Sequence, residues 1–274
     1  MQDVSQDMQL AIKAAIAAGD LIVDMFSSDI KFERKGDMKG LVSDTDILAE
    51  KEIIRILNAS GYTILGEESK STTDPNELYW IIDALDGTTN FVRNLPLFGV
   101  SLALMSRYDV LLGVIYNPWT KECYYAERGK GAFLNGNPIQ ITQSISPAAS
   151  ILFINHGYDF ADRERYALLA DRLAVEYSVR TLGSTALELC YVAKGVADAF
   201  ICSGDELWDF AAGILIVCEA GGKLTDWKGY PWNGSHSFVF ASNGAIHKTL
   251  VPMIQDLQPV DYSKPKYNRV SAVK

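Results

Sequence analysis

Residues 80–91 read WIIDALDGTTNF, and this stretch joins an apolar run to two aspartates, a glycine and two threonines. The run that begins at Trp80 is typical of a β-strand, and Asp83 and Asp86 stand three residues apart where it ends. Asp-Gly is a common turn dipeptide, so a plain turn is the simplest interpretation of these residues alone. The alternative is a site for a metal ion and a phosphate.

The patterns around this stretch predict a mixed α-β protein. Residues 80–142 contain short runs rich in β-branched and aromatic residues, separated by the turn sequences NPWT and NGNP, which predicts an antiparallel sheet built from hairpins. Apolar residues at helical spacing predict helices over about 3–26 and 43–61. After residue 150 the predicted strands and helices alternate.

This organisation predicts two subdomains and a tail. Residues 1–145 form an α+β subdomain that contains the antiparallel sheet and most of the candidate metal ligands. Residues 146–258 form an α/β subdomain that supplies Asp209. The polar residues 259–274 are expected to be a loosely held tail.

Composition excludes several classes of protein. The chain has 274 residues, 48% of them hydrophobic, and a formal net charge of −9, which argues against a nucleic-acid-binding surface. No apolar run approaches the roughly 18 residues of a membrane span, and the N-terminus lacks the basic start of a signal peptide. The four cysteines lack C-x-x-C spacing, so we expect neither zinc nor disulfides, and a cytoplasmic protein.

Acidic residues gather at the ends of predicted strands and the starts of predicted helices. They are Glu67 and Glu68, Asp83 and Asp86, Asp209, and Asp46. Such positions can converge on one edge of a sheet, where α/β architectures bind ligands. Carboxylates held together repel one another unless a cation joins them, and oxygen ligands suit hard ions, magnesium above all.

The residues that follow Asp86 predict a phosphate site. Gly87 and Thr88 begin a run, GTTN, that resembles the start of a helix, where a glycine and free backbone N–H groups can hold a phosphate. Metal ions on one side and N–H donors on the other suit hydrolysis of a phosphomonoester. A calcium EF-hand loop does not fit, because it would place Ile82 where an aspartate is needed.

Several motifs, taken in chain order, resemble the inositol monophosphatase family. They are GEES at 66–69, WIIDALDGTTNF at 80–91, and WDFAAG with EAGG within 208–222. LVSDTD at 41–46 is similar to the family segment that ends in a catalytic aspartate. Ala84 stands where most members have proline, outside the ligand set. The resemblance covers roughly residues 8–257.

The resemblance implies a five-layered α-β-α-β-α sandwich, usually a homodimer, with a phosphatase site that uses two to three Mg²⁺ ions and is inhibited by lithium. The metal ligands that it implies are Glu67, Asp83, the Leu85 carbonyl, Asp86 and Asp209. Thr88 and Asp46 would orient and deprotonate the attacking water, and the N–H groups of Gly87 and Thr88 would hold the phosphate. Lys35 and Glu68 would be accessory residues.

Substrate contacts are implied at Asp86, Asp209, Thr185 and Cys202. Cys202 stands where inositol-selective members have a glutamate that binds inositol hydroxyls, which weakens the case for inositol phosphate and favours other phosphomonoesters. A sugar or inositol phosphatase is the first hypothesis, and a bisphosphate nucleotidase of the same fold the second. The third is a scaffold that binds RNA or the transcription machinery, although the acidic composition argues against direct contact with nucleic acid.

Overall fold

A computed structural model describes residues 4–26, 31–35, 41–69, 74, 77–107, 109–143, 146–234 and 237–257. Its larger sheet has seven strands in the order β3-β4-β5-β6-β7-β8-β9. Their bounds are Thr63–Gly66, Leu78–Asp86, Gly99–Ser106, Asp109–Asn117, Glu122–Glu127, Ala132–Leu134 and Asn137–Pro138. β3 and β4 are parallel, and the remaining pairs are antiparallel, as the hairpin pattern of 80–142 predicted.

The smaller sheet has five strands in the order β11-β10-β12-β14-β13. Taken from β10 to β14, their bounds are Ile151–His156, Ser178–Arg180, Ala199–Ser203, Lys223–Thr225 and Val239–Ser242. β10 is parallel to β11 and β12, while β14 is antiparallel to β12 and β13.

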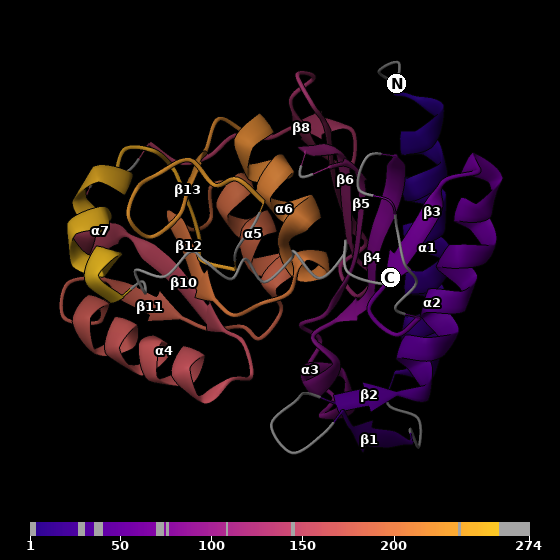
Figure 1. Ribbon diagram of the computed structural model, residues 1–274, viewed down its shortest axis with the longest axis horizontal. Helices are drawn as coiled ribbons and strands as arrows, with labels where there is room; N and C mark the ends of the chain where they lie inside the picture. The colour runs from indigo at the N-terminus through magenta and orange to yellow at the C-terminus, as the bar shows by residue number, and fades with distance from the viewer. Residues whose placement is uncertain are drawn as a thin grey trace.

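Helices separate and cover the two sheets, so the molecule has five layers (Figure 1). The outer helices α1 (Gln6–Met25) and α2 (Asp44–Leu57) cover the seven-stranded sheet. α5 (Thr185–Ala193) and α6 (Leu207–Glu219) lie between the sheets. α4 (Phe160–Leu173) and α7 (His247–Ile254) cover the outer face of the five-stranded sheet. The predicted α-β-α-β-α sandwich is confirmed.

The layering explains why the central strands read as continuous apolar runs. β4 is buried on both faces from Tyr79 onward. Its Trp80 and Ile82 pack in the cluster that includes α1 and α2, whereas Tyr79 and Ile81 pack in the cluster that includes α5 and α6. Side chains of a strand alternate between faces, so a strand with helices on both sides needs apolar residues throughout.

Shorter elements complete the described chain. β1 (Phe32–Arg34) and β2 (Leu41–Ser43) form a separate antiparallel pair, which the sequence patterns did not predict. α3 (Thr88–Val92) follows β4. The 3₁₀ turns η1, η2 and η3 span Asn58–Ser60, Pro147–Ala149 and Gln255–Leu257.

The strands of the two larger sheets occupy separate parts of the chain. Those of the seven-stranded sheet all precede residue 143, and those of the five-stranded sheet all follow residue 146. Residue 145, where the predicted subdomain boundary lies, and the predicted tail 259–274 lie outside the described residues, so the division into subdomains stays a prediction.

Two expectations drawn from composition can be compared with the structure. All four cysteines are free, as their spacing predicted. None of the helices in the described part of the chain is both long and apolar enough to cross a bilayer.

Candidate metal and phosphate site

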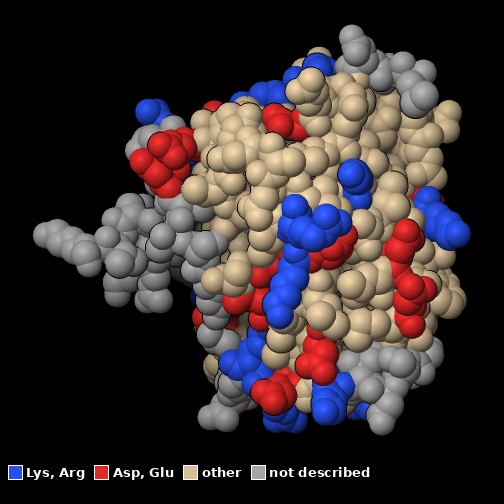
Figure 2. Space-filling model, turned by 90° about the vertical axis from the view of Figure 1, so that its right-hand side faces the viewer, with Lys and Arg blue, Asp and Glu red and all other residues tan. Residues whose placement is uncertain are grey.

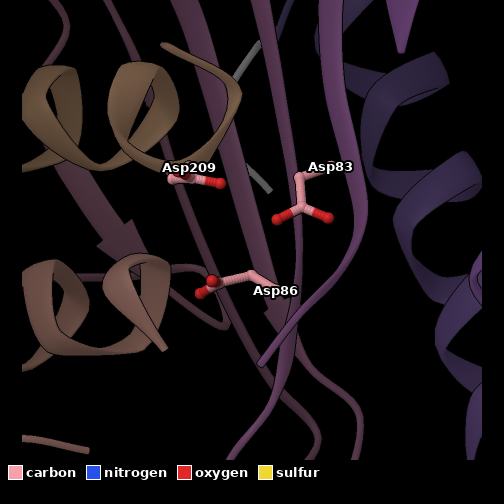
Figure 3. Close-up of side chains that lie close together, drawn as sticks. All are labelled: Asp83, Asp86 and Asp209. Atoms are coloured by element: carbon pink, nitrogen blue, oxygen red, sulfur yellow. The ribbon is translucent and has the colours of Figure 1, made fainter. Parts of the chain in front are cut away.

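Three aspartates converge between the seven-stranded sheet and α6. Asp83 and Asp86 come from β4, and Asp209 from the first turn of α6. One carboxylate oxygen from each lies within 4.8 Å of the others. Figure 3 shows the carboxylates of Asp83 and Asp209 pointing toward one another across the space between strand and helix, with Asp86 beside them. The structure thus brings together residues that are 126 positions apart in the chain.

A β-bulge allows two aspartates three residues apart to share one face. In a regular strand Asp83 and Asp86 would point to opposite faces of the sheet. Here Asp83 pairs with Ser101 and Asp86 with Gly99, so three steps on β4 match two on β5. The extra residue turns the strand and brings both carboxylates to the side of α5 and α6. This irregularity creates the paired ligands.

Mutual repulsion and burial shape the electrostatics of the cluster. Burial raises the pKa of Asp83 well above its usual range, and Glu67, Asp86 and Asp209 raise it further. Burial also raises the pKa of Asp86 to about 7, although hydrogen bonds to that carboxylate oppose the shift. Carboxylates in this state bind protons or cations. The all-oxygen donor set fits a hard divalent ion such as Mg²⁺.

Glu67 and Glu68 lie next to the aspartates, and both contact the side-chain ammonium group of Lys35. Lys35 Nζ lies 2.5 Å from Glu67 Oε1 and also contacts Glu68 Oε1. Burial alone would lower the pKa of Lys35, but the two glutamates raise it overall. The Glu67 N–H donates to the carbonyl oxygen of Ile82 at 3.2 Å, which places Glu67 beside Asp83. The predicted accessory residues therefore lie together with a predicted ligand.

Glu50 holds the turn that presents Glu67, and the sequence patterns missed it. Its two carboxylate oxygens accept hydrogen bonds from the N–H groups of Glu68, at 2.9 Å, and Ser69, at 2.8 Å. A Cβ on Gly66 would lie 2.6 Å from this carboxylate, so only glycine fits there. Glu50 follows Asp46 by one turn of α2, and this i, i+4 spacing is the one signal that could have placed it at the site.

We expect Glu50→Gln to lower Mg²⁺ affinity about tenfold, because residues that orient metal ligands typically contribute that much. The oxygen of the glutamine amide can accept a hydrogen bond from one of the two N–H groups, but its NH₂ group faces the other. The backbone at Glu68 should therefore shift. Calorimetric titration with Mg²⁺ measures the effect. Glu52→Gln on the same helix, which loses only a pairing with Arg55, is the matched control. Equal affinities for the two variants would contradict the role.

A chain of hydrogen bonds links α3, β4 and α2 beside the acids. Thr88 Oγ1 lies 2.7 Å from Asp46 Oδ1 and 3.1 Å from the Leu85 carbonyl oxygen. The other oxygen of Asp46 accepts from the backbone N–H and the hydroxyl of Ser43, at 2.8 and 2.5 Å. Burial raises the pKa of Asp46. Hydrogen bonds from Ser43 and Thr88 lower it, but the net shift is upward. The structure therefore brings the two predicted catalytic residues into direct contact.

Gly87 precedes α3 in a conformation that favours glycine. Its φ is +97°, and a Cβ there would lie 2.8 Å from the Leu97 carbonyl oxygen. Thr88 begins α3 directly after it, within one turn of Asp86. The predicted phosphate-binding residues thus adjoin the acidic cluster.

The N-terminus of α5 also contacts the cluster. Asp86 Oδ2 accepts hydrogen bonds from the Ser184 hydroxyl, at 2.5 Å, and from the Ala186 N–H, at 2.8 Å. Thr185, a predicted substrate contact, instead donates from Oγ1 to Asp205 Oδ2 at 2.7 Å. The sequence patterns missed Ser184 and Asp205, since a serine at the start of a predicted helix and a lone acid in a predicted loop carry no distinctive signal.

Cys202 is a further predicted substrate contact. Its side chain is fully buried in the core cluster of α5 and α6, and its Sγ lies 3.9 Å from the Ser237 carbonyl oxygen. In this structure the thiol has no surface open to a ligand.

Comparison with known proteins connects this geometry to a family. The model of the Inositol monophosphatase family matches residues 3–258. "Fructose-1,6-bisphosphatase/inositol-1-monophosphatase" of Thermotoga maritima is 34% identical over 255 residues, covering 91% of this chain and 96% of the relative. "Nus factor SuhB" of Pasteurella multocida is 32% identical over 268 residues, covering 92% and 96%. "Inositol monophosphatase 1" of Sus scrofa is 31% identical, covering 90% and 94%.

Solved structures give the same result. The extragenic suppressor protein SuhB of Bartonella henselae superposes with a TM-score of 0.84 at 32% identity, covering 92% of this chain and 99% of that one. The inositol monophosphatase of Thermotoga maritima superposes with a TM-score of 0.83 at 32% identity, covering 92% and 98%. The likeness therefore extends over both sheets and every layer of the fold.

Proposed function

The chain belongs to the inositol monophosphatase family, and from that premise we propose that it hydrolyses a sugar or inositol monophosphate with Mg²⁺ at the acidic cluster. Members of this family are phosphatases that act on phosphomonoesters, and the chain is such a phosphatase. The observation that carries the proposal is the convergence of Asp83, Asp86 and Asp209 within 4.8 Å, next to Thr88 and its partner Asp46.

The proposed metal ligands are carboxylates that repel one another in the metal-free protein. They are Glu67, Asp83, Asp86 and Asp209, with the Leu85 carbonyl as a further oxygen donor. When bound, Mg²⁺ would supply the positive charge that activates water and stabilises the leaving oxygen. The role of the chain is to hold these oxygens in place through Ser184, Ala186 and the Glu206 N–H.

Thr88 and Asp46 are placed to remove a proton from the attacking water. Thr88 Oγ1 would accept the proton of the water while its own proton passes to Asp46 Oδ1, 2.7 Å away. The raised pKa of Asp46 makes its carboxylate a stronger base than an exposed one. The two bonds from Ser43 fix the other oxygen, so Oδ1 stays directed at Thr88.

The phosphate would bind next to this pair. The N–H groups of Gly87 and Thr88 open a short helix beside the aspartates, and they are the proposed donors to the phosphate oxygens. Lys35 would add positive charge on the side of Glu67. Together these groups orient the phosphate for in-line attack. The homodimer and the cytoplasmic location implied by the sequence belong to the same proposal.

Phosphate release from a panel of phosphomonoesters tests the function. We expect the purified protein to release phosphate from an inositol or sugar phosphate with Mg²⁺, and to lose this activity with a chelator or with lithium. The panel includes inositol phosphate, fructose bisphosphate, adenosine bisphosphate and histidinol phosphate. Preference for adenosine bisphosphate would replace the sugar substrate with a nucleotide. Absence of release from every compound would contradict the proposal.

A role in binding RNA or the transcription machinery is the alternative raised by relatives named Nus factor. On the face formed by α1 and α2, described acidic and basic side chains lie intermingled, without a continuous basic area (Figure 2). Phosphate backbones require such an area. This face therefore gives no support to direct contact with nucleic acid.

A further inference from the structure

The segment of residues 182–184 presents hydrogen-bond donors that hold Asp86. It joins β11 to α5, and its last residue, Ser184, is the N-cap of α5. The Ser184 hydroxyl donates to Asp86 Oδ2 at 2.5 Å, and the Ala186 N–H donates to the same oxygen at 2.8 Å. Both donors move with the 182–184 segment, because it sets where α5 begins. The orientation of the Asp86 carboxylate therefore depends on what fixes this segment.

Glu188 fixes the segment through the backbone N–H of Leu182. This carboxylate lies one turn after Ser184 in α5 and has no exposed surface. Glu188 Oε1 accepts a hydrogen bond from the Leu182 N–H at 2.5 Å. Glu188 Oε2 accepts one from Asn155 Nδ2, at the end of β10, at 3.3 Å. The carboxylate thus joins the 182–184 segment to the five-stranded sheet.

Asn90 fixes the same segment through a carbonyl oxygen. It belongs to α3, and the N–H groups at the start of that helix are the proposed donors to the phosphate. Asn90 Nδ2 donates to the Leu182 carbonyl oxygen at 2.8 Å and to the Leu97 carbonyl oxygen at 2.8 Å. The φ of Gly183 is +74°, and a Cβ there would lie 3.3 Å from Asn90 Nδ2, so a side chain on this residue would crowd the amide. Leu182 is therefore held at its N–H by α5 and at its carbonyl oxygen by α3.

Asp86 needs this support because its neighbours repel it. One oxygen of its carboxylate lies within 4.8 Å of an oxygen of Asp83 and of Asp209. Like charges at this separation push the side chains apart in the absence of a cation. A carboxylate that is already fixed loses less freedom when it binds an ion, so the ion binds more tightly. Loss of the bonds that fix Asp86 should therefore lower metal affinity, and not only the stability of the fold.

We propose that Asn90 and Glu188 are positioning residues, which hold the 182–184 segment and thereby keep Asp86 in the orientation that binds Mg²⁺. This inference rests on the proposed phosphatase function. Through Asn90, the helix that is proposed to bind the phosphate also fixes the segment that holds a proposed metal ligand. The phosphate half and the metal half of the site are thus kept at a set separation.

Asn90→Ala and Glu188→Gln test the inference by calorimetric titration with Mg²⁺. We expect each variant to lower Mg²⁺ affinity about tenfold or more, because residues that orient metal ligands typically contribute that much. Two matched controls lose the same kinds of hydrogen bond elsewhere in the fold. Asn135→Ala removes an amide that bonds two backbone groups near the start of β7. Glu219→Gln alters a carboxylate that accepts from two backbone N–H groups of the turn between β7 and β8. Both controls should melt at a lower temperature than the wild type but keep its Mg²⁺ affinity.

A double-mutant cycle with Ser184→Ala separates positioning from a general loss of structure. If Asn90 acts through Ser184, the amide has less to hold once the hydroxyl is gone. Adding Asn90→Ala to Ser184→Ala should then lower Mg²⁺ affinity by only about threefold or less. Excess Mg²⁺ should also restore the kcat of Asn90→Ala, because the defect lies in affinity.

Three results would overturn the inference. They are wild-type Mg²⁺ affinity in Asn90→Ala, an equal loss of affinity in Asn135→Ala, and an undiminished loss when Asn90→Ala is added to Ser184→Ala. Asn90 is partly exposed, so Asn90→Ala decides the test if Glu188→Gln fails to fold. If the wild type binds Mg²⁺ but hydrolyses none of the phosphomonoesters, the proposed function fails and these affinities still decide the inference. If the wild type binds no Mg²⁺, both fail.

Discussion

Asp83→Asn is expected to abolish turnover while the protein stays folded. Asp83 is one of the three aspartates that converge within 4.8 Å, and Glu67, Asp86 and Asp209 all raise its pKa. A catalytic metal contributes several kcal/mol to stabilising the transition state, and its loss corresponds to about a thousandfold or more in kcat. Asparagine has the same shape but lacks the charge that holds a divalent ion.

The fold should survive this change and become more stable without metal. In the metal-free protein the buried Asp83 carboxylate carries an unfavourable interaction, shown by its strongly raised pKa. A neutral amide removes that repulsion, so the melting temperature in a chelator should rise or stay equal. Mg²⁺ should then raise it less than in the wild type.

Phosphate release and thermal unfolding, each with and without Mg²⁺, measure both effects. Asp109 is an exposed acid on β6. The variant Asp109→Asn is therefore the matched control and should behave as the wild type does. Turnover of Asp83→Asn close to that of the wild type would show that the metal site lies elsewhere.

The acidic cluster could be predicted from sequence because its members occupy positions with local signals. Asp83 and Asp86 end an apolar run, and Asp209 opens an apolar helix, and both patterns are visible within a few residues. The layers could also be predicted, because helical and strand periodicities are local. The bulge that brings Asp83 and Asp86 to one face could not, since it depends on pairing with Ser101 and Gly99.

The residues that support the site depend on contacts between distant parts of the chain. Ser184 meets Asp86 across 98 residues, and Glu50 meets Ser69 across 19. Apart from its i, i+4 spacing from Asp46, nothing near Glu50 distinguishes it from the other charged residues of α2. For Cys202 the family resemblance implied a substrate contact. Burial is a property of tertiary packing that the sequence did not reveal, and the thiol is fully buried in the core. Local patterns therefore predict the ligands better than the residues that orient them.

The stabilisation of the protein by Mg²⁺ is expected to grow strongly as the pH rises from 5 to 8. The pKa of Asp86 is about 7 in the folded protein, whereas an aspartate in the unfolded chain has a pKa of about 4. Between these values the folded metal-free protein keeps a proton that the unfolded chain has released. The stability associated with Asp86 is therefore fully present below the unfolded pKa and is lost as the pH rises through about 7.

The difference for Asp86 corresponds to about 4 kcal/mol. Burial raises the pKa of Asp83 and Asp209 in the same direction. Mg²⁺ would bind the ionised carboxylates, so protons compete with it more strongly at pH 5 than at pH 8. Bound Mg²⁺ thus restores the stability that the metal-free protein loses as the pH rises.

Urea unfolding with Mg²⁺ and with a chelator, at pH 5 and at pH 8, measures the increment in the free energy of unfolding that Mg²⁺ causes. The increment is more informative than stability alone, because His247 titrates in the same range with the opposite sign. Burial lowers the pKa of His247 to about 4, so its contribution to stability is present above about 6.5 and lost as the pH falls. Since His247 lies away from the cluster, between Ser242 and Thr225, its contribution is equal with and without the ion and cancels in the difference. An increment that is the same at both pH values would show that the ion does not bind these carboxylates. If the ion does bind them, Asp86→Asn should reduce the pH dependence of the increment.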